Sequence, residues 1–229
     1  MSMTLQWYQW MALAALGICL TACIVHFIRL LRMGKPADYS RQAGKTPGAI
    51  HYAFTGAMSP AKKESAFLHL PTYTAGLFYH MGTFVSLILF FFIISGLVPD
   101  GWLAIAIMTF LCISVCSGIA ILVKRIVKKE LQSLSNPDDF ISNILVTLFQ
   151  IITIAVILFP LSLPASLLPR LHASPPPIVL PAYYLIFTLL MLYLPVGKLR
   201  HSVYFFAARY HLGYFFGWRG VWPPGNIKN

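Results

Sequence analysis

Five long apolar segments alternate with shorter polar and basic segments along the chain. They cover approximately residues 7–31, 72–97, 102–123, 141–163 and 178–206. Each is at least as long as the roughly 20 residues that an α-helix needs to cross a bilayer. Together they use about half of the chain or more, which leaves no room for a separate soluble domain. The pattern predicts an all-α membrane protein, a single domain over residues 1–229 built as a bundle of five transmembrane helices.

Composition and charge agree with this class and add an orientation. Of the residues 58% are apolar and only 10% charged, with a mean hydropathy of +0.74, which excludes an ordinary soluble domain. The net charge of +11 does not form a nucleic-acid patch, because 16 of the 17 Lys and Arg residues fall on one side of the predicted bundle, and Arg170 falls on the other. By the positive-inside rule the N-terminus is outside and the C-terminus is cytoplasmic. An odd number of helices agrees with termini on opposite sides.

Two histidines within the apolar segments are the strongest candidates for chemistry, because an ionisable side chain is costly inside a membrane. His80 lies in the second segment, and His201 lies near the cytoplasmic end of the fifth. The second helix runs outward and the fifth inward, so both residues are expected at similar depth in the cytoplasmic half. Two neutral imidazoles facing each other across a bundle could supply both axial ligands of a buried b-type haem.

Neighbouring residues fit the same interpretation. Lys198 and Arg200 lie beside His201, where cations could bind the haem propionates at the membrane surface. Gly76 and Gly82 would leave space for a flat macrocycle against the second helix. The alternative is that the histidines make hydrogen bonds between helices and bind no metal.

Other chemistries have little support in the sequence. There is no HxxxH or HxxHH cluster for a di-iron site and no GxSxG nucleophile motif. The segments hold no carboxylate in their interior, and no polar pathway through several helices is expected, which disfavours a solute transporter. The two CxxxC pairs, Cys19/Cys23 and Cys112/Cys116, are interpreted as small packing residues rather than metal ligands.

Two short motifs resemble a known family. The segments "LFYHMG" (residues 77–82) and "YLPVGKLRHSVY" (residues 193–204) resemble the respiratory nitrate reductase gamma subunit and its relatives. These relatives include the cytochrome b subunits of sulfate-reducer redox complexes of the Hmc, Tmc and Dsr types. The resemblance implies that His80 and His201 bind the cytoplasm-proximal haem b. The family's ligands for a second haem correspond to Phe90 and Tyr183 here, which predicts that this haem is lost.

A second haem would need other ligands, and His69 with His26 is the pair that the sequence offers. The resemblance further implies electron transfer between menaquinone and a cytoplasmic iron–sulfur subunit similar to heterodisulfide reductase. Other membrane and periplasmic cytochrome subunits would join the complex, in the cytoplasmic membrane of a bacterium or archaeon. The basic first loop, with Lys35, Lys62 and Lys63, and the aromatic tail are then docking or quinone-headgroup surfaces. The alternative function is a haem-free structural anchor for such a complex.

Overall fold

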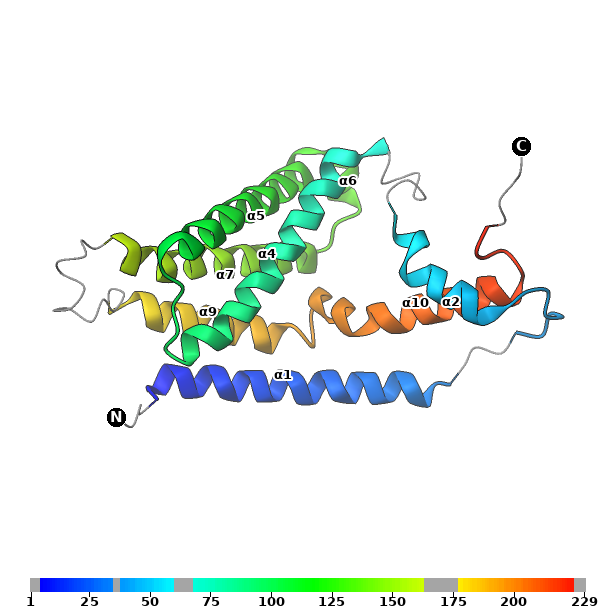
Figure 1. The fold of residues 1–229 in the computed structure, drawn as a ribbon, viewed down its shortest axis with the longest axis horizontal. Coiled ribbons are helices and arrows are strands. Elements are labelled where there is room, and N and C mark those ends of the chain that lie inside the picture. The colour runs from blue at the N-terminus through cyan, green and yellow to red at the C-terminus, as the bar shows by residue number, and fades with distance from the viewer. Residues whose placement is uncertain (1–4, 35–37, 60–67, 163–176, 225–229) are drawn as a thin grey trace. The chain divides into compact units, whose positions relative to one another are not determined.

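The computed structural model describes residues 5–34, 38–59, 68–162 and 177–224, and every regular element among them is a helix (Figure 1). The helices are α1 (Trp7–Arg32), α2 (Thr46–Phe54), η1 (Gly56–Met58), α4 (Leu70–Ile94), α5 (Gly101–Val127), α6 (Lys129–Ser133), α7 (Pro137–Ser162), α9 (Val179–Tyr193), η3 (Lys198–Arg200) and α10 (His201–Trp218). Four of these, α1, α4, α5 and α7, are long and apolar enough to cross a membrane. The chain is therefore an all-α, multi-pass membrane protein, as its hydrophobic pattern predicts.

The fifth predicted span differs from the expectation of one helix over residues 178–206. Helix α9 ends at Tyr193, and α10 begins only at His201, with η3 between them. Pro195 explains the break, because proline has no N–H to donate and its ring clashes with the preceding turn. The amides of Val196 and Gly197 instead bond to the Tyr193 carbonyl, at 3.1 and 2.8 Å. The number of spans among the described helices is five if the interrupted pair crosses the membrane once.

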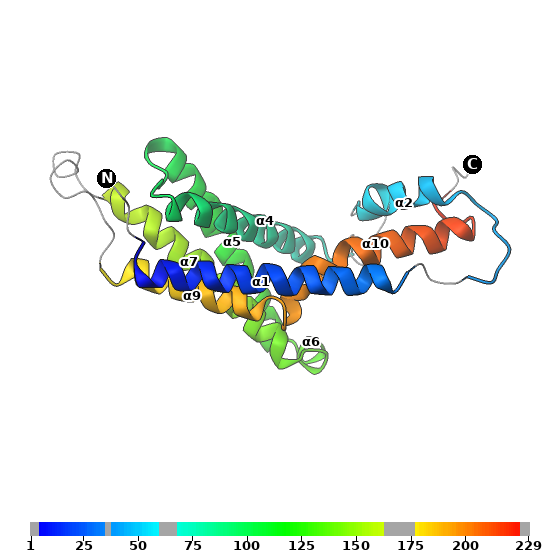
Figure 2. The same ribbon diagram turned by 90° about the horizontal axis from the view of Figure 1, so that it is seen from below.

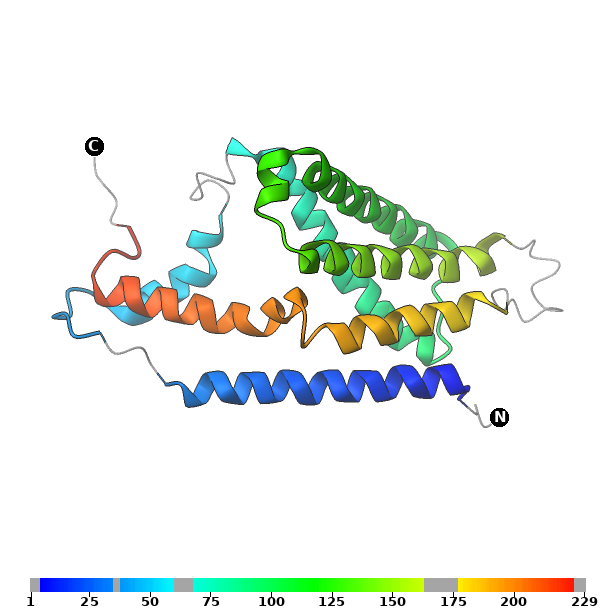
Figure 3. The ribbon, with the colours of Figure 1, turned by 180° about the vertical axis from the view of Figure 1, so that it is seen from behind.

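The chain divides into two compact units, and each is described by itself. The first contains residues 1–20 and 71–199, and the second contains residues 21–70 and 200–229. In the first unit α7 packs between α5 and α9, and α4 crosses this layer obliquely (Figures 1 and 3). The start of α1 is held to α9, because the Tyr8 and Tyr184 rings stack at 5.4 Å and Gln9 donates to the Tyr184 hydroxyl at 3.4 Å.

The beginning of α7 is fixed by a reciprocal cap. The Asn136 amide donates to the Asp139 carboxylate at 3.0 Å, and the Asp139 amide donates to the Asn136 side chain at 3.0 Å. Pro137 occupies the first helical position, where a missing N–H costs nothing. Asp138 and Asp139 follow in the first turn, where the helix dipole favours negative charge. The segment N-P-D-D therefore starts a helix that carries two carboxylates at one end.

In the second unit, part of the long first loop folds onto the C-terminal tail. Helix α2 lies along α10 (Figure 2), and the contact is made by small residues. A Cβ at Gly213 would lie 2.6 Å from the Ile50 Cα, and one at Gly217 would lie 2.5 Å from the Ala49 Cβ. Two segments that the sequence presents as separate docking surfaces thus cover each other along this contact. Lys35, Lys62 and Lys63 lie outside the described residues.

Candidate functional site

His80 lies on the exposed face of α4 within the first unit. Its Nδ1 is 2.7 Å from the carbonyl oxygen of Gly76, one turn earlier in the helix. A carbonyl oxygen can only accept, so Nδ1 carries the proton and donates. In the neutral ring the lone pair is then on Nε2, at the tip of the side chain. Imidazoles that bind metals through Nε2 are held by this kind of second bond, which fixes both tautomer and ring orientation.

The surface around His80 is open and apolar. A Cβ at Gly76 would meet nothing within 4 Å, while Leu77, Met81 and Phe84 on the same part of α4 are exposed. A flat apolar group could therefore approach the His80 ring along this face. Gly82 has a different explanation from the one that the sequence suggests. A Cβ there would lie 2.1 Å from the Ser114 hydroxyl of α5, so this glycine lets two helices meet.

Helix α4 also makes polar contacts with α5 and α7 that the sequence did not lead us to expect. The Tyr79 hydroxyl donates to the Asn143 carbonyl at 2.8 Å and lies 2.9 Å from the Thr147 hydroxyl. Gln150 donates to the Thr83 hydroxyl at 3.0 Å and accepts from the Ser114 hydroxyl at 2.8 Å. We call these six residues the polar cluster. It joins α4, α5 and α7 in the interior of the first unit.

Aromatic side chains are packed at the two positions where the resemblance would place the ligands of a second haem. Phe90 and Tyr183 are fully buried, as are Phe149 and Phe187. The Phe90 and Phe187 rings stack at 3.5 Å with an interplanar angle of 5°, and Phe149 lies 5.6 Å from both Tyr183 and Phe187. These four residues form an aromatic cluster in which neither expected position presents a metal-binding group to open space.

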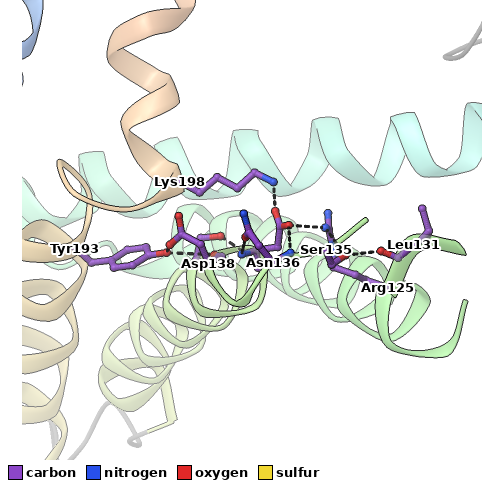
Figure 4. Close-up of polar contacts among 9 residues, drawn as sticks. Arg125, Leu131, Ser135, Asn136, Asp138, Tyr193 and Lys198 are labelled. Carbon is purple, nitrogen blue, oxygen red and sulfur yellow. Dashed lines mark hydrogen bonds and ion pairs between the residues drawn. The ribbon is translucent and has the colours of Figure 1, made fainter. Parts of the chain in front are cut away.

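Lys198 is engaged by a carboxylate of its own unit. It forms an ion pair with Asp139, which also pairs with Arg125 at 3.2 Å (Figure 4). The neighbouring Asp138 accepts from the Tyr193 hydroxyl at the end of α9. The Asp139 side chain is 5% exposed, whereas Lys198 and Arg125 are 50% and 31% exposed. A carboxylate at the start of α7 is thus one partner of Lys198.

The remaining predicted ligands lie in the second unit. His201 is the first residue of α10 and is exposed, as is Arg200 just before it. Because His80 belongs to the other unit, its pairing with His201 stays a prediction. His26 on α1 has its Nδ1 3.0 Å from the Tyr204 hydroxyl, a bond between two helices. His69 is exposed in the turn before α4, and its pairing with His26 also stays a prediction.

Clustered metal ligands are not found in the part of the chain that the structure describes, where no three His, Cys, Asp or Glu side chains come together. A haem with two axial histidines does not require such a group. Four cysteines were interpreted as packing residues. Cys19 is buried within the chain, whereas Cys112 and Cys116 on α5 are exposed.

The residues that the sequence interpretation missed are the polar ones on α7. Asn143, Thr147, Gln150 and Thr153 recur every three or four positions, so they share one helix face. This spacing can be read from the sequence, but the high mean hydropathy of the segment draws attention away from single polar residues. Comparison with known families, with curated proteins and with solved structures finds no match for this chain.

Proposed function

We propose that the chain is a haem b-carrying membrane subunit of a respiratory redox complex, exchanging electrons between a membrane quinone and a cytoplasmic iron–sulfur protein. The observation that supports it most is the His80 ring, held through Nδ1 by the Gly76 carbonyl. With the proton on Nδ1, Nε2 carries the lone pair that a bond to haem iron would require. The exposed apolar face around it fits a porphyrin edge. Haem bound here would supply one-electron redox chemistry at a fixed depth in the membrane.

The chain's own residues have separate tasks in this proposal. His80 and His201 would hold the haem iron, and Arg200 would bind a propionate. Lys198 contacts a propionate only if it leaves Asp139, so we assign it the weaker role of the two cations. The aromatic cluster around Phe90 occupies the positions where the resemblance would place the ligands of a second haem. We therefore propose one haem rather than two, with His26 and His69 in other roles.

A haem-free anchor is the second candidate, and two contacts favour it. His26 bonds to Tyr204 between helices, and Lys198 pairs with Asp139, so residues suggested for cofactor binding serve the packing of the chain itself. Under this alternative His80 would simply satisfy the Gly76 carbonyl. Haem content separates the two candidates, because the anchor needs none.

The deciding experiment is a pyridine haemochrome assay on the purified protein, with reduced-minus-oxidised spectra. We expect one b haem per chain, lost in His80→Ala and in His201→Ala. His51→Ala is the matched control, because His51 is an exposed histidine on α2 with no role in the proposal. Two haems per chain would overturn our interpretation of Phe90 and Tyr183. A haem-free protein from haem-replete cells would leave the structural anchor.

A further inference from the structure

A continuous line of polar side chains runs along the interior face of α7. We call it the polar stripe, and it comprises Asp139, Ser142, Asn143, Thr147, Gln150 and Thr153. Five of the six are buried, and Gln150 and Thr153 have no exposed surface at all. From Asp139 to Thr153 the stripe covers about 21 Å at 1.5 Å per residue, which is most of the roughly 30 Å hydrocarbon core.

Hydrogen bonds connect much of the stripe. The Thr147 hydroxyl donates to the Asn143 side chain at 3.3 Å, and the Tyr79 hydroxyl lies 2.9 Å from Thr147. Gln150 then donates to the Tyr79 carbonyl at 3.3 Å and to the Thr83 hydroxyl at 3.0 Å. The contacts of α4 therefore bridge the stripe from Asn143 to Gln150.

Two buried hydroxyls of the first unit, one on α4 and one on α9, have no hydrogen-bond partner among the described residues. They belong to Tyr183 and Ser86, both fully buried, and neither side-chain oxygen makes a hydrogen bond to the part of the chain that the structure describes. The Thr153 hydroxyl lies close to that of Tyr183 without meeting hydrogen-bond geometry, and it donates to the Phe149 carbonyl at 2.7 Å. A buried hydroxyl without a partner destabilises the fold, because it has given up its hydrogen bonds to water. Buried water normally satisfies such groups.

We infer that the polar stripe is a water-bearing half-channel, open at the Asp139 end and closed near Tyr183, which gives protons a route into the membrane interior. Water at Tyr183 would satisfy the orphaned hydroxyl and extend the chain of donors and acceptors beyond Thr153. The aromatic cluster and the apolar residues Val156 and Ile157 close the outer end. A path closed at one end does not let protons leak across the membrane. It can nevertheless deliver protons to a reaction that takes place within the membrane.

Charge indicates which species the half-channel could carry. Between Asp139 and the end of α7 the sequence has no charged residue, so a metal ion or charged solute would find no counter-charge. Hydroxyl and amide groups with intervening water can pass a proton by exchanging hydrogen bonds. At the open end Arg125 and Lys198 form ion pairs with Asp139.

The competing explanation is that the stripe is dry and only holds helices together. Single cysteines in a background lacking the four native ones distinguish the two, with Ag⁺ as a water-borne probe in nanodiscs. Cysteines replacing Thr147, Gln150 and Thr153 should react at least about tenfold faster than those replacing Leu148 and Ile151. The latter are 43% and 42% exposed on the lipid-facing side and lie at the same depths as Thr147 and Gln150. Equal or undetectable reaction at the stripe positions would overturn the inference.

A plug in the middle of the stripe tests its direction. Adding Gln150→Leu should abolish the reaction of a cysteine at Thr153, beyond the plug, and leave that at Thr147 unchanged. Loss at Thr147 with retention at Thr153 would show an opening at the other end and contradict the proposal. If the Leu variant does not stay monodisperse, Gln150→Met gives the same block with a more adaptable side chain.

The thermal unfolding midpoint of Tyr183→Phe is an independent test, because the direction of its change depends on whether water binds the Tyr183 hydroxyl. If the Tyr183 hydroxyl is dry and unpaired, removing it should raise the midpoint of unfolding. If water satisfies it, as we infer, the midpoint should stay the same or fall. A clear rise would therefore overturn the hydration of this end. Neither this measurement nor the Ag⁺ assay depends on haem, so their outcome is separate from that of the proposed function.

Discussion

Gly76 and Gly82 occupy the same helix, six residues apart, in opposite surroundings. A Cβ at Gly82 would collide with Ser114, while one at Gly76 would meet open space. Because Ser114 is buried and α4 and α5 touch there, the collision cannot be relieved by moving a flexible side chain alone. The two positions therefore form an internal comparison of what each glycine does.

Replacement of these glycines by alanine should have opposite effects on stability. We expect Gly82→Ala to lower the free energy of unfolding by about 1–3 kcal/mol, as overpacking does. Gly76→Ala should leave it unchanged or raise it by about 0.5–1 kcal/mol, because alanine favours the helix. Thermal unfolding in detergent measures both. Adding Ser114→Gly should partly rescue Gly82→Ala, and an equal loss in both single variants would contradict the assigned contact.

For single residues, the sequence predicts which side chains are chemically unusual better than it predicts which neighbours they contact. His80 stands out because an imidazole within an apolar segment is costly, and that argument needs no coordinates. The reason for Gly82 could not be seen in the same way, since Ser114 is 32 positions later and only packing brings it near. Which face of α4 is covered likewise depends on α5 and α7. The spacing of polar residues on α7 shows that they share a face but not what they contact.

The connection between α9 and α10 is held in place largely through one side chain, that of Asp139. Asp139 holds Lys198 of η3 and Arg125 of α5 to the start of α7 (Figure 4). Both cations are partly exposed, so solvent screens the pairs and reduces their contribution. Asparagine at this position removes the charge but keeps the acceptor that the Asn136 amide needs.

Asp139→Asn should therefore lower the free energy of unfolding by about 1–2 kcal/mol, between the values for exposed and buried pairs. It should also make the peptide bond after Lys198 more sensitive to trypsin, since η3 is no longer held. Unfolding curves and timed digestion followed by mass spectrometry measure the two effects. Asp138→Asn is the comparison variant, because Asp138 accepts a hydrogen bond from the Tyr193 hydroxyl and acts on Lys198 only through its nearby charge, without a direct ion pair. Identical digestion of both variants would mean that the ion pairs do not hold η3.

At the element scale, four apolar segments were predicted to within a few residues because cations, prolines and glycines border them. The fifth was predicted as one helix, because mean hydropathy over a window does not take into account that Pro195 lacks the N–H needed for a helical hydrogen bond. The tail after it forms much of α10 and packs on α2, which the sequence did not predict, while its role in docking a partner stays a prediction. Small residues such as Gly213 and Ala49 make that contact, and they carry no signal until the partner helix is known.

For the whole molecule, the break in the fifth span decides the topology. If α9 and its continuation cross the membrane once, the five spans place the termini on opposite sides; if they return, four spans place them on the same side. The distribution of Lys and Arg favours the first arrangement.

We expect an alkaline phosphatase fusion to the C-terminus to be inactive and a fluorescent-protein fusion there to be bright, while a tag at the N-terminus is cut by protease added to spheroplasts. Helix α9 alone has 15 residues, about 22 Å, which is shorter than the hydrocarbon core. Residues beyond Tyr193 must therefore lie within the membrane if α9 crosses it. A fusion truncated after Tyr193 should accordingly give mixed reporter activity, whereas one at Trp218 should report the cytoplasm cleanly. An active phosphatase at Trp218 would instead mean that the chain returns, and His201 would then lie at a different depth from His80.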